Sequence, residues 1–224
     1  MLGVMSLTNK SRAIVIARQV FVGVYPGTDY SHFETDGTMV AYGAATCWRD
    51  ELQSLTGARL QSPASDIVEN IPEAAVTFET GARYPTDYIT TNHQLNHDWF
   101  PGSVIRPHLH WWQVSANVPN WLLAYRWQKQ GDVKTTAWTL LAWASNAFAW
   151  AAGALNQITG FGSITPPVGY GQVSDIVQFR VHRDVTNVST LFAGADPEAA
   201  DIDATNFDTH IEVNMLGSHQ EYTK

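Results

Sequence analysis

Two histidines one residue apart are the side chains of this chain best suited to chemistry. His108 and His110 follow a turn at Pro101 and Gly102, in a stretch expected to form a strand. Because side chains alternate between the two faces of a strand, both imidazoles point the same way. Such a pair can bind a metal, line a polar pocket or face a partner subunit. Which alternative holds decides whether the protein is an enzyme or a building block.

A metal site of the cupin type is the first alternative. The spacing Gly102-x5-His108-x-His110 resembles the front half of the first cupin motif, in which two histidines of one strand bind a metal. Gln113 stands where a carboxylate would be needed, and the second cupin motif, Pro-x-Gly-x2-His, is missing. His182, on a later strand, is the candidate for a third ligand. A cupin-like metal-dependent enzyme is therefore the less favoured interpretation.

The favoured interpretation of the histidine pair is structural. A histidine beside aromatic residues, here Trp111 and Trp112, is usually half-buried, hydrogen-bonded and stacked on a ring. A third alternative is a trimeric fibre, in which His108 and His110 of three chains bind one metal on the axis. We expect no catalytic residue, no bound metal and no cofactor.

Composition narrows the possible function classes. The 224 residues carry a net charge of −8 without a basic run, which argues against a nucleic-acid-binding protein. Charged residues make up 15% of the chain, below the roughly 25% of typical soluble domains, so we expect part of the surface to contact another subunit. The single Cys47 excludes an internal disulfide, and no apolar run is long enough to indicate a membrane span. Arg12 and Arg18 interrupt the apolar N-terminal stretch, so a signal peptide is not expected.

Strand and turn patterns dominate from residue 60 onward. Short alternating stretches separated by glycine and proline indicate a β-sandwich or barrel. The expected strands include residues 76–79, 88–92, 104–115, 121–129, 134–144, 176–183 and 209–215.

One short helix is expected before these strands. In residues 47–56, Trp48, Leu52 and Leu55 fall at i, i+4 and i+7, and Gly57 follows the segment. Two other segments lack a clear strand pattern. Residues 144–154 are rich in alanine and can form a short helix or a loop. The acidic run 196–208 is expected to be a solvated loop.

Residues 1–45 are expected to form an extended N-terminal arm with one or two strands, and residues 46–224 a sandwich domain. Residues 13–24 are too rich in apolar residues for a disordered leader and need a partner to cover them. A sandwich buries one face of each sheet, so the further aromatic residues on its strands favour a homotrimer. The residues expected at subunit contacts are Ile14, Val15, Val20, Val22, His108, His110, Trp111, Trp112, Trp121 and Trp127.

Three parts of the chain together resemble a family of tailed-phage virion proteins. The first is LNHDWFPGS at residues 95–103, which leads into IRPHLHW at residues 105–111. The second is FETG at residues 78–81. The third is DTHI at residues 208–211, followed by LGSHQEYTK at residues 216–224. The resemblance covers roughly residues 60–224 and leaves the first 45 residues uncovered.

This resemblance implies an all-β, jelly-roll β-sandwich and a non-enzymatic role in the virion, which is assembled in the host cytoplasm. The implied function is a capsid decoration or cement protein that stabilises the phage head. A component of a head or tail fibre, or a receptor-binding component, is the alternative. The implied partners are other copies in a homotrimer and the major capsid protein or other virion proteins, not nucleic acid or a membrane. No catalytic residues come with the resemblance.

Overall fold

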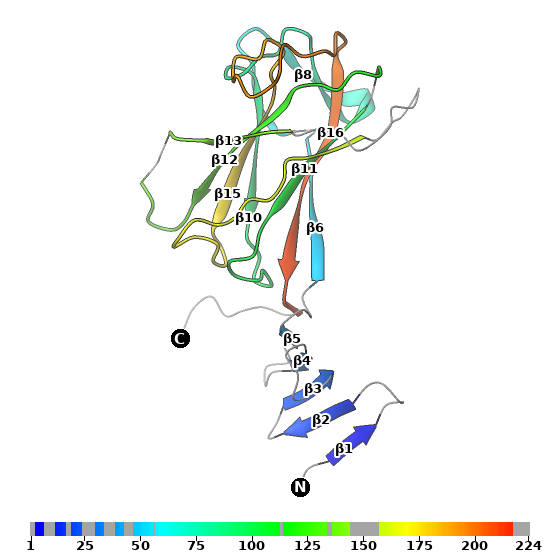
Figure 1. Cartoon of the computed structure of the whole chain (residues 1–224), viewed down its shortest axis with the longest axis vertical. Helices are drawn as coiled ribbons and strands as arrows, with labels where there is room; N and C mark the ends of the chain where they lie inside the picture. The colour runs from blue at the N-terminus through cyan, green and yellow to red at the C-terminus, as the bar shows by residue number, and fades with distance from the viewer. Residues whose placement is uncertain are drawn as a thin grey trace.

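The protein is built from β-strands throughout the part of the chain that the structure describes. The structure is a computed structural model, and it describes residues 3–6, 12–16, 19–23, 30–33, 39–42, 47–55, 57–112, 114–133, 136–143 and 157–216. In these residues the helical structure is a single 3₁₀ turn, η2 (Ile71–Glu73). None of the described helical structure is long and apolar enough to cross a membrane. Figure 1 shows two packed sheets above a smaller N-terminal sheet, so the expected all-β sandwich is confirmed.

The first sheet of the sandwich has five antiparallel strands in the order β13-β12-β15-β10-β7. Along β15 the inward side chains of Val177, Phe179 and Val181 are buried, whereas Gln178 and Arg180 on the outer face are half-buried. This alternation arises because successive side chains of a strand point to opposite faces. The strands are β7 (Arg59–Gln61), β10 (Tyr88–Gln94), β12 (Trp121–Gln128), β13 (Thr139–Ala142) and β15 (Ile176–Arg183).

The second sheet follows the order β14-β11-β16-β9-β8, with β6 paired to β16 beside this path. Strand β16 has twelve residues, enough for two successive partners on one edge. Its residues 202–204 pair with β9 and its residues 206–213 pair with β6, while β11 occupies the other edge. The strands are β6 (Cys47–Ser54), β8 (Ile67–Asn70), β9 (Ala75–Phe78), β11 (Arg106–Trp111), β14 (Gln157–Gly160) and β16 (Ile202–Val213).

Large aromatic side chains fill the space between the two sheets. Trp121 contacts Phe78 edge to face with ring centroids 5.0 Å apart, and its ring lies 6.2 Å from that of Trp111. Phe179 and Phe207 bring the sheets together at another point, with centroids 5.0 Å apart. Burial of one such side chain contributes roughly 1.5–3 kcal/mol. Because these inward positions form the core, the outer faces of the sheets remain for binding.

The N-terminal strands form a third sheet in the order β1-β2-β3-β4-β5-β17. The described part of residues 1–45 therefore contains five short strands, more than the one or two expected. The C-terminal β17 completes this sheet by pairing with β5, at the edge opposite β1. The strands are β1 (Gly3–Ser6), β2 (Arg12–Ile16), β3 (Gln19–Gly23), β4 (Tyr30–Phe33), β5 (Met39–Tyr42) and β17 (Met215–Leu216).

The helix expected at residues 47–56 is wrong, because residues 47–54 form strand β6. The spacing of Trp48 and Leu52 fits a helix face, but it fits the period of two of a strand equally well. Both side chains are exposed on the same face of β6. Eight residues of β6 pair with β16, and this backbone ladder outweighs the weak local preference for a helix. The other candidate helix, at residues 144–154, lies outside the described residues.

The acidic run 196–208 is not a solvated loop throughout. Its last residues belong to β16, and Asp196 is a fully buried partner of Arg183, with Oδ2 2.7 Å from Nε. The Arg183 guanidinium also donates hydrogen bonds to the backbone carbonyls of Phe78 and Glu198. A buried charge requires such a complete set of partners, so Arg183 fixes this segment against the sandwich.

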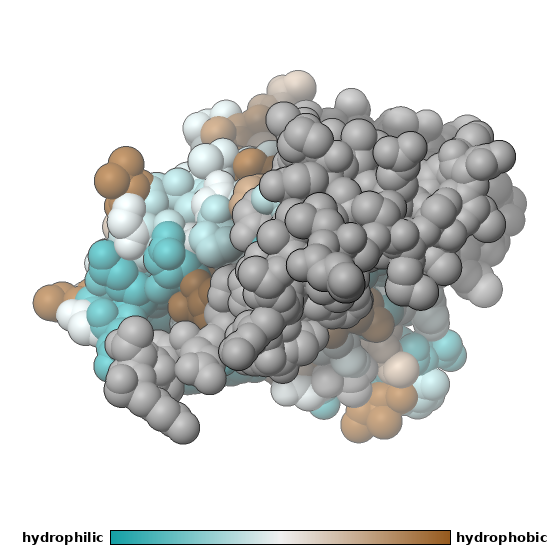
Figure 2. Space-filling model, turned by 90° about the horizontal axis from the view of Figure 1, so that it is seen from below, coloured by the Kyte–Doolittle hydropathy of each residue, from teal (hydrophilic) through white to brown (hydrophobic). Residues whose placement is uncertain are grey.

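Apolar residues also remain on the described surface. Seen from below, those that are visible are separated by polar residues (Figure 2). Single exposed apolar side chains are normal for a folded protein. Trp48 and Leu52 differ because they share one face of the edge strand β6, at 42% and 65% exposed.

Candidate metal-binding cluster

Strands β11 and β16 bring His108, His110 and Asp208 together on the outer face of the second sheet of the sandwich. The antiparallel register places His108 directly opposite Asp208. The neighbours Leu109 and Phe207 point inward and are fully buried, so the histidines and the carboxylate point outward. The expectation that both imidazoles share one face of a strand is confirmed.

Asp208 lies between the two imidazoles. Its Oδ1 is 2.5 Å from Nε2 of His108, and its Oδ2 is 3.2 Å from Nε2 of His110. One nitrogen from each histidine and one carboxylate oxygen lie within 4.8 Å of one another. The side chain of Asp208 is 6% exposed, and those of His108 and His110 are 10% and 17% exposed. The cluster is therefore well shielded but reachable from one side.

A shallow cleft of about 460 Å³ opens over this cluster. Gly160 of β14 lies opposite His108, and a Cβ added at Gly160 would meet no atom within 4 Å. The missing side chain therefore leaves space over His108. On the other side, the ring of His210 stacks edge to face on that of His108, with centroids 4.4 Å apart. Nε2 of His210 lies 2.7 Å from Oδ1 of Asp50.

The environment of Asp208 keeps its carboxyl group ionised. Burial raises the pKa of Asp208. The contacts with His108 and His110 lower it by more than burial raises it, so the pKa of Asp208 lies below its usual value. An ionised carboxylate only accepts hydrogen bonds. An Nε2 that donates to Asp208 carries its proton there; the contact of His110 with Oδ2 meets hydrogen-bond geometry, whereas His108 lies close to Oδ1 without an aligned hydrogen bond.

Two imidazole nitrogens and one carboxylate form a ligand set that suits zinc, iron(II) or manganese. Metal–ligand bonds of about 2.0–2.2 Å hold neighbouring ligand atoms roughly 3.0–3.5 Å apart. The 2.5 Å separation between His108 and Asp208 would have to widen by a fraction of an ångström, and the Nε2 protons would have to leave. With three protein ligands on one side, the cleft would supply the remaining coordination positions. The arrangement can thus hold a metal, or serve without one as a hydrogen-bonded link between β11 and β16.

His182, the expected third ligand, does not join this cluster. It lies on β15 of the other sheet, and its Nδ1 is 2.8 Å from the backbone oxygen of Asp87. The rings of Tyr84 and Tyr88 pack against it. Burial lowers the pKa of His182 to about 4, so this histidine is neutral at pH 7. Gln113, at the position where the cupin comparison needed a carboxylate, lies outside the described residues.

Asp208, His210 and Asp50 were missed by sequence reasoning. Asp208 ends an acidic run that was interpreted as a loop, and Asp50 was assigned to a helix. One signal was available, because Asp208-x-His210 has the same alternation as His108-x-His110. Two alternating polar pairs on separate strands become one cluster only when the strands are neighbours.

The structure divides the expected contact residues into different environments. Trp111, Trp121 and Trp127 are buried and belong to the core of the single chain. They fill the gap between the two sheets, which sequence alternation alone did not reveal. Trp112 is half-buried just after β11, at the end of the cluster strand. The four aliphatic residues lie in the N-terminal sheet at backbone positions 14, 15, 20 and 22.

Comparison with known proteins adds no family to this description. No protein-family model matches the chain, and no curated protein matches it either. The class that the structure itself defines is an all-β sandwich with two antiparallel sheets.

Proposed function

We propose that this chain is a non-enzymatic structural protein of a tailed-phage virion, a decoration or cement protein of the head that acts as a homotrimer. The resemblance of three sequence stretches to such proteins motivates the proposal. Jelly-roll connectivity of the sandwich is part of the same proposal. The N-terminal sheet is the observation that carries it.

The N-terminal sheet supports assembly because its described strands make up one sheet of their own. Its strands pair with one another and with β17 in the described residues. The register of β2 and β3 sets Val15 opposite Val20 and Ile14 opposite Phe21. Residues 13–24 of the sequence are rich in apolar residue types. A sheet of this kind needs a second layer from another molecule to remove apolar area from water.

A second feature agrees with assembly. Strand β6 pairs with β16 along one edge. Along its other edge, it pairs with no strand of the described part of the chain. Its exposed face carries Trp48 and Leu52. An edge strand of eight residues with exposed apolar side chains can accept a strand from a neighbour.

The proposal is tested by the mass of the purified chain in solution. We expect a trimer by sedimentation velocity at micromolar concentration, and a shift toward monomer in Ile14→Asp and Val15→Asp. Val168→Asp is the matched control, because Val168 is fully exposed in a loop of the sandwich. A stable monomer, or an I14D variant that assembles like V168D, would contradict the proposal.

A second candidate function is metal binding, with a cupin-like enzyme as its extension. The observation that favours it is the meeting of His108, His110 and Asp208. Elemental analysis of purified protein would decide between the two. One iron, manganese or zinc per chain that is lost in H108Q/H110Q and in D208N would favour the metal site, and a metal-free chain would favour the structural role.

A further inference from the structure

The outer face of the five-stranded sheet carries a cluster of arginines, although the chain as a whole is acidic. Arg59, Arg126 and Arg180 come from three different strands, β7, β12 and β15. The register brings them together, with Thr90 opposite both Arg59 and Arg180, and Gln178 opposite Arg126. Three arginines from distant parts of the sequence therefore lie on one surface, which the strand pairing creates.

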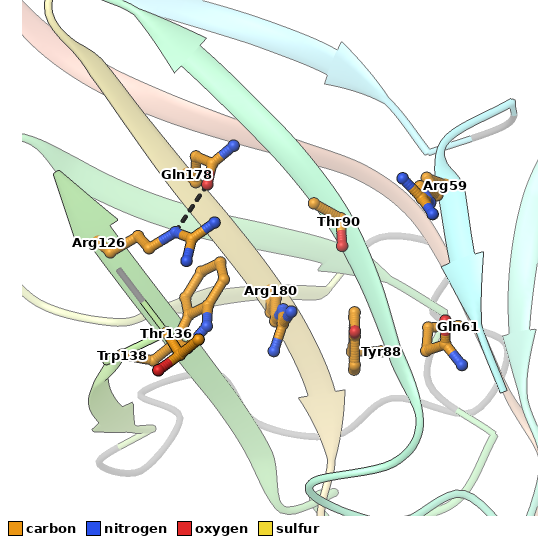
Figure 3. A pocket seen from close by; sticks show the side chains of 9 residues that line it. All are labelled: Arg59, Gln61, Tyr88, Thr90, Arg126, Thr136, Trp138, Gln178 and Arg180. Atoms are coloured by element: carbon orange, nitrogen blue, oxygen red, sulfur yellow. Dashed lines mark hydrogen bonds between the residues drawn. The ribbon is translucent and has the colours of Figure 1, made fainter. Parts of the chain in front are cut away.

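These arginines line a cleft of about 530 Å³, shown in Figure 3. Figure 3 shows their side chains spread across the cleft, with Trp138 beside Arg126 and Tyr88 beside Arg180. The remaining lining residues are uncharged and polar: Gln61, Thr90, Thr136 and Gln178. None of the described lining residues is a carboxylate.

Aromatic rings hold two of the guanidinium groups in place. The guanidinium carbon of Arg180 lies 4.2 Å from the ring centroid of Trp138 and 4.1 Å from that of Tyr88. Arg126 lies 4.4 Å from Trp138, and its Nε donates a 2.7 Å hydrogen bond to Oε1 of Gln178. Stacking on a ring fixes the plane of a guanidinium and leaves its edge, where the N–H groups lie, pointing away from the ring. These long side chains are therefore already ordered, so a ligand that binds them causes little further loss of conformational entropy.

Arg180 also has an unmet hydrogen-bonding need. Its Nε is buried and has no hydrogen-bond partner among the described residues. Burial, and then the charge of Arg180, lower the pKa of Arg126. Two cations that repel each other and a buried unsatisfied donor are features that a bound anion would relieve.

We propose that this cleft binds a sugar that carries a carboxylate or a phosphate group. The arginines supply bidentate contacts to the anionic group. The threonine, glutamine and tyrosine side chains match the hydroxyl groups of a sugar, since each can donate or accept hydrogen bonds. The volume falls within the range of small-molecule sites. This inference goes beyond the virion role and stands independently of it.

The test is a titration of the purified full-length chain by isothermal calorimetry with four probes. Glucuronic acid and glucose 6-phosphate carry the two anionic groups, glucose carries neither, and inorganic phosphate lacks the sugar. We expect one or both anionic sugars to bind in the millimolar range or tighter, and more tightly than phosphate, with no binding of glucose. The anionic sugar that binds more tightly identifies the group that the site prefers.

Variants connect binding to the cleft. R180Q and R59Q should each weaken binding by about tenfold or more, because each removes a charge-assisted contact. R59Q changes an exposed residue, so it tests the site without disturbing the aromatic stack. R106Q is the matched control, since Arg106 also stacks on a tryptophan, 4.3 Å from the Trp48 ring, but on the other sheet.

Four results would overturn the proposal. They are no binding of either anionic sugar, equal binding of glucose, equal binding of phosphate alone, and equal losses in R59Q and R106Q. Thermal unfolding of each variant verifies that it is folded. A folded R59Q with wild-type affinity counts against the site even if R180Q does not fold.

Discussion

Two buried histidines should make the protein unstable in mild acid. His182 and His93 are 1% and 3% exposed, and burial lowers the pKa of each to about 4. In the unfolded chain both histidines return to a pKa of about 6.5. The unfolded state therefore binds more protons than the folded state between pH 6.5 and 4.

The stabilisation from the neutral histidines is fully present above pH 6.5 and is lost as the pH falls toward 4. One pKa unit corresponds to about 1.4 kcal/mol, so each histidine costs roughly 2 kcal/mol between pH 7 and pH 5. Both together remove about 4 kcal/mol, a large part of the 5–15 kcal/mol that holds a typical domain folded.

The assay is urea unfolding followed by tryptophan fluorescence at pH 7, 6 and 5. We expect H182Q and H93Q each to reduce the loss of unfolding free energy by about 2 kcal/mol, because glutamine has no titratable group. The double variant should have a nearly flat profile over this range. Each variant can be less stable at pH 7, but the readout is the slope against pH. A wild-type profile that is flat from pH 7 to 5, or a double variant that keeps the full slope, would refute the reasoning.

Three further predictions concern the core and the charged clusters. D208A should lower the unfolding free energy by about 1.5–3 kcal/mol in urea denaturation, because His108 and His110 lose their charged partner. A change below about 0.5 kcal/mol would contradict a stabilising role for these contacts. R183M should lower the unfolding free energy by about 3–5 kcal/mol, because it leaves Asp196 buried without its partner. The double variant R183M/D196N should recover part of that loss, and no recovery would argue against a stabilising ion pair between Arg183 and Asp196. W121A should cost about 3–5 kcal/mol in the same assay, and a cost below 1 kcal/mol would argue that Trp121 lies outside the core.

The two outer faces of the sandwich carry different chemistry. One presents imidazoles around a carboxylate, and the other presents guanidinium groups on aromatic rings. The histidines and Asp208 lie on the interior strands β11 and β16, and Arg126 and Arg180 lie on the interior strands β12 and β15, where the core on the inner face fixes the backbone. A site held by such strands keeps its geometry better than one built on loops.

The sequence by itself determined the fold class and the direction of the histidine pair. Alternation with a period of two is a local property, so residues 121–129 and 176–183 were correctly predicted as strands. The same rule placed His108 and His110 on one face. Local patterns were insufficient at residues 47–54, where the spacing of Trp48 and Leu52 fits a helix and a strand equally.

The tertiary structure alone decided which strands are neighbours. Asp208 reaches His108 because β16 pairs with β11, across a separation of one hundred residues that no local pattern encodes. The pairing of β7, β10, β15 and β12 likewise gathers Arg59, Arg180 and Arg126 from distant segments. The same holds for Trp121, whose side chain enters the core because the second sheet covers that face. Strand pairing depends on the free energy of the whole sandwich, so these sites become visible only in the folded chain.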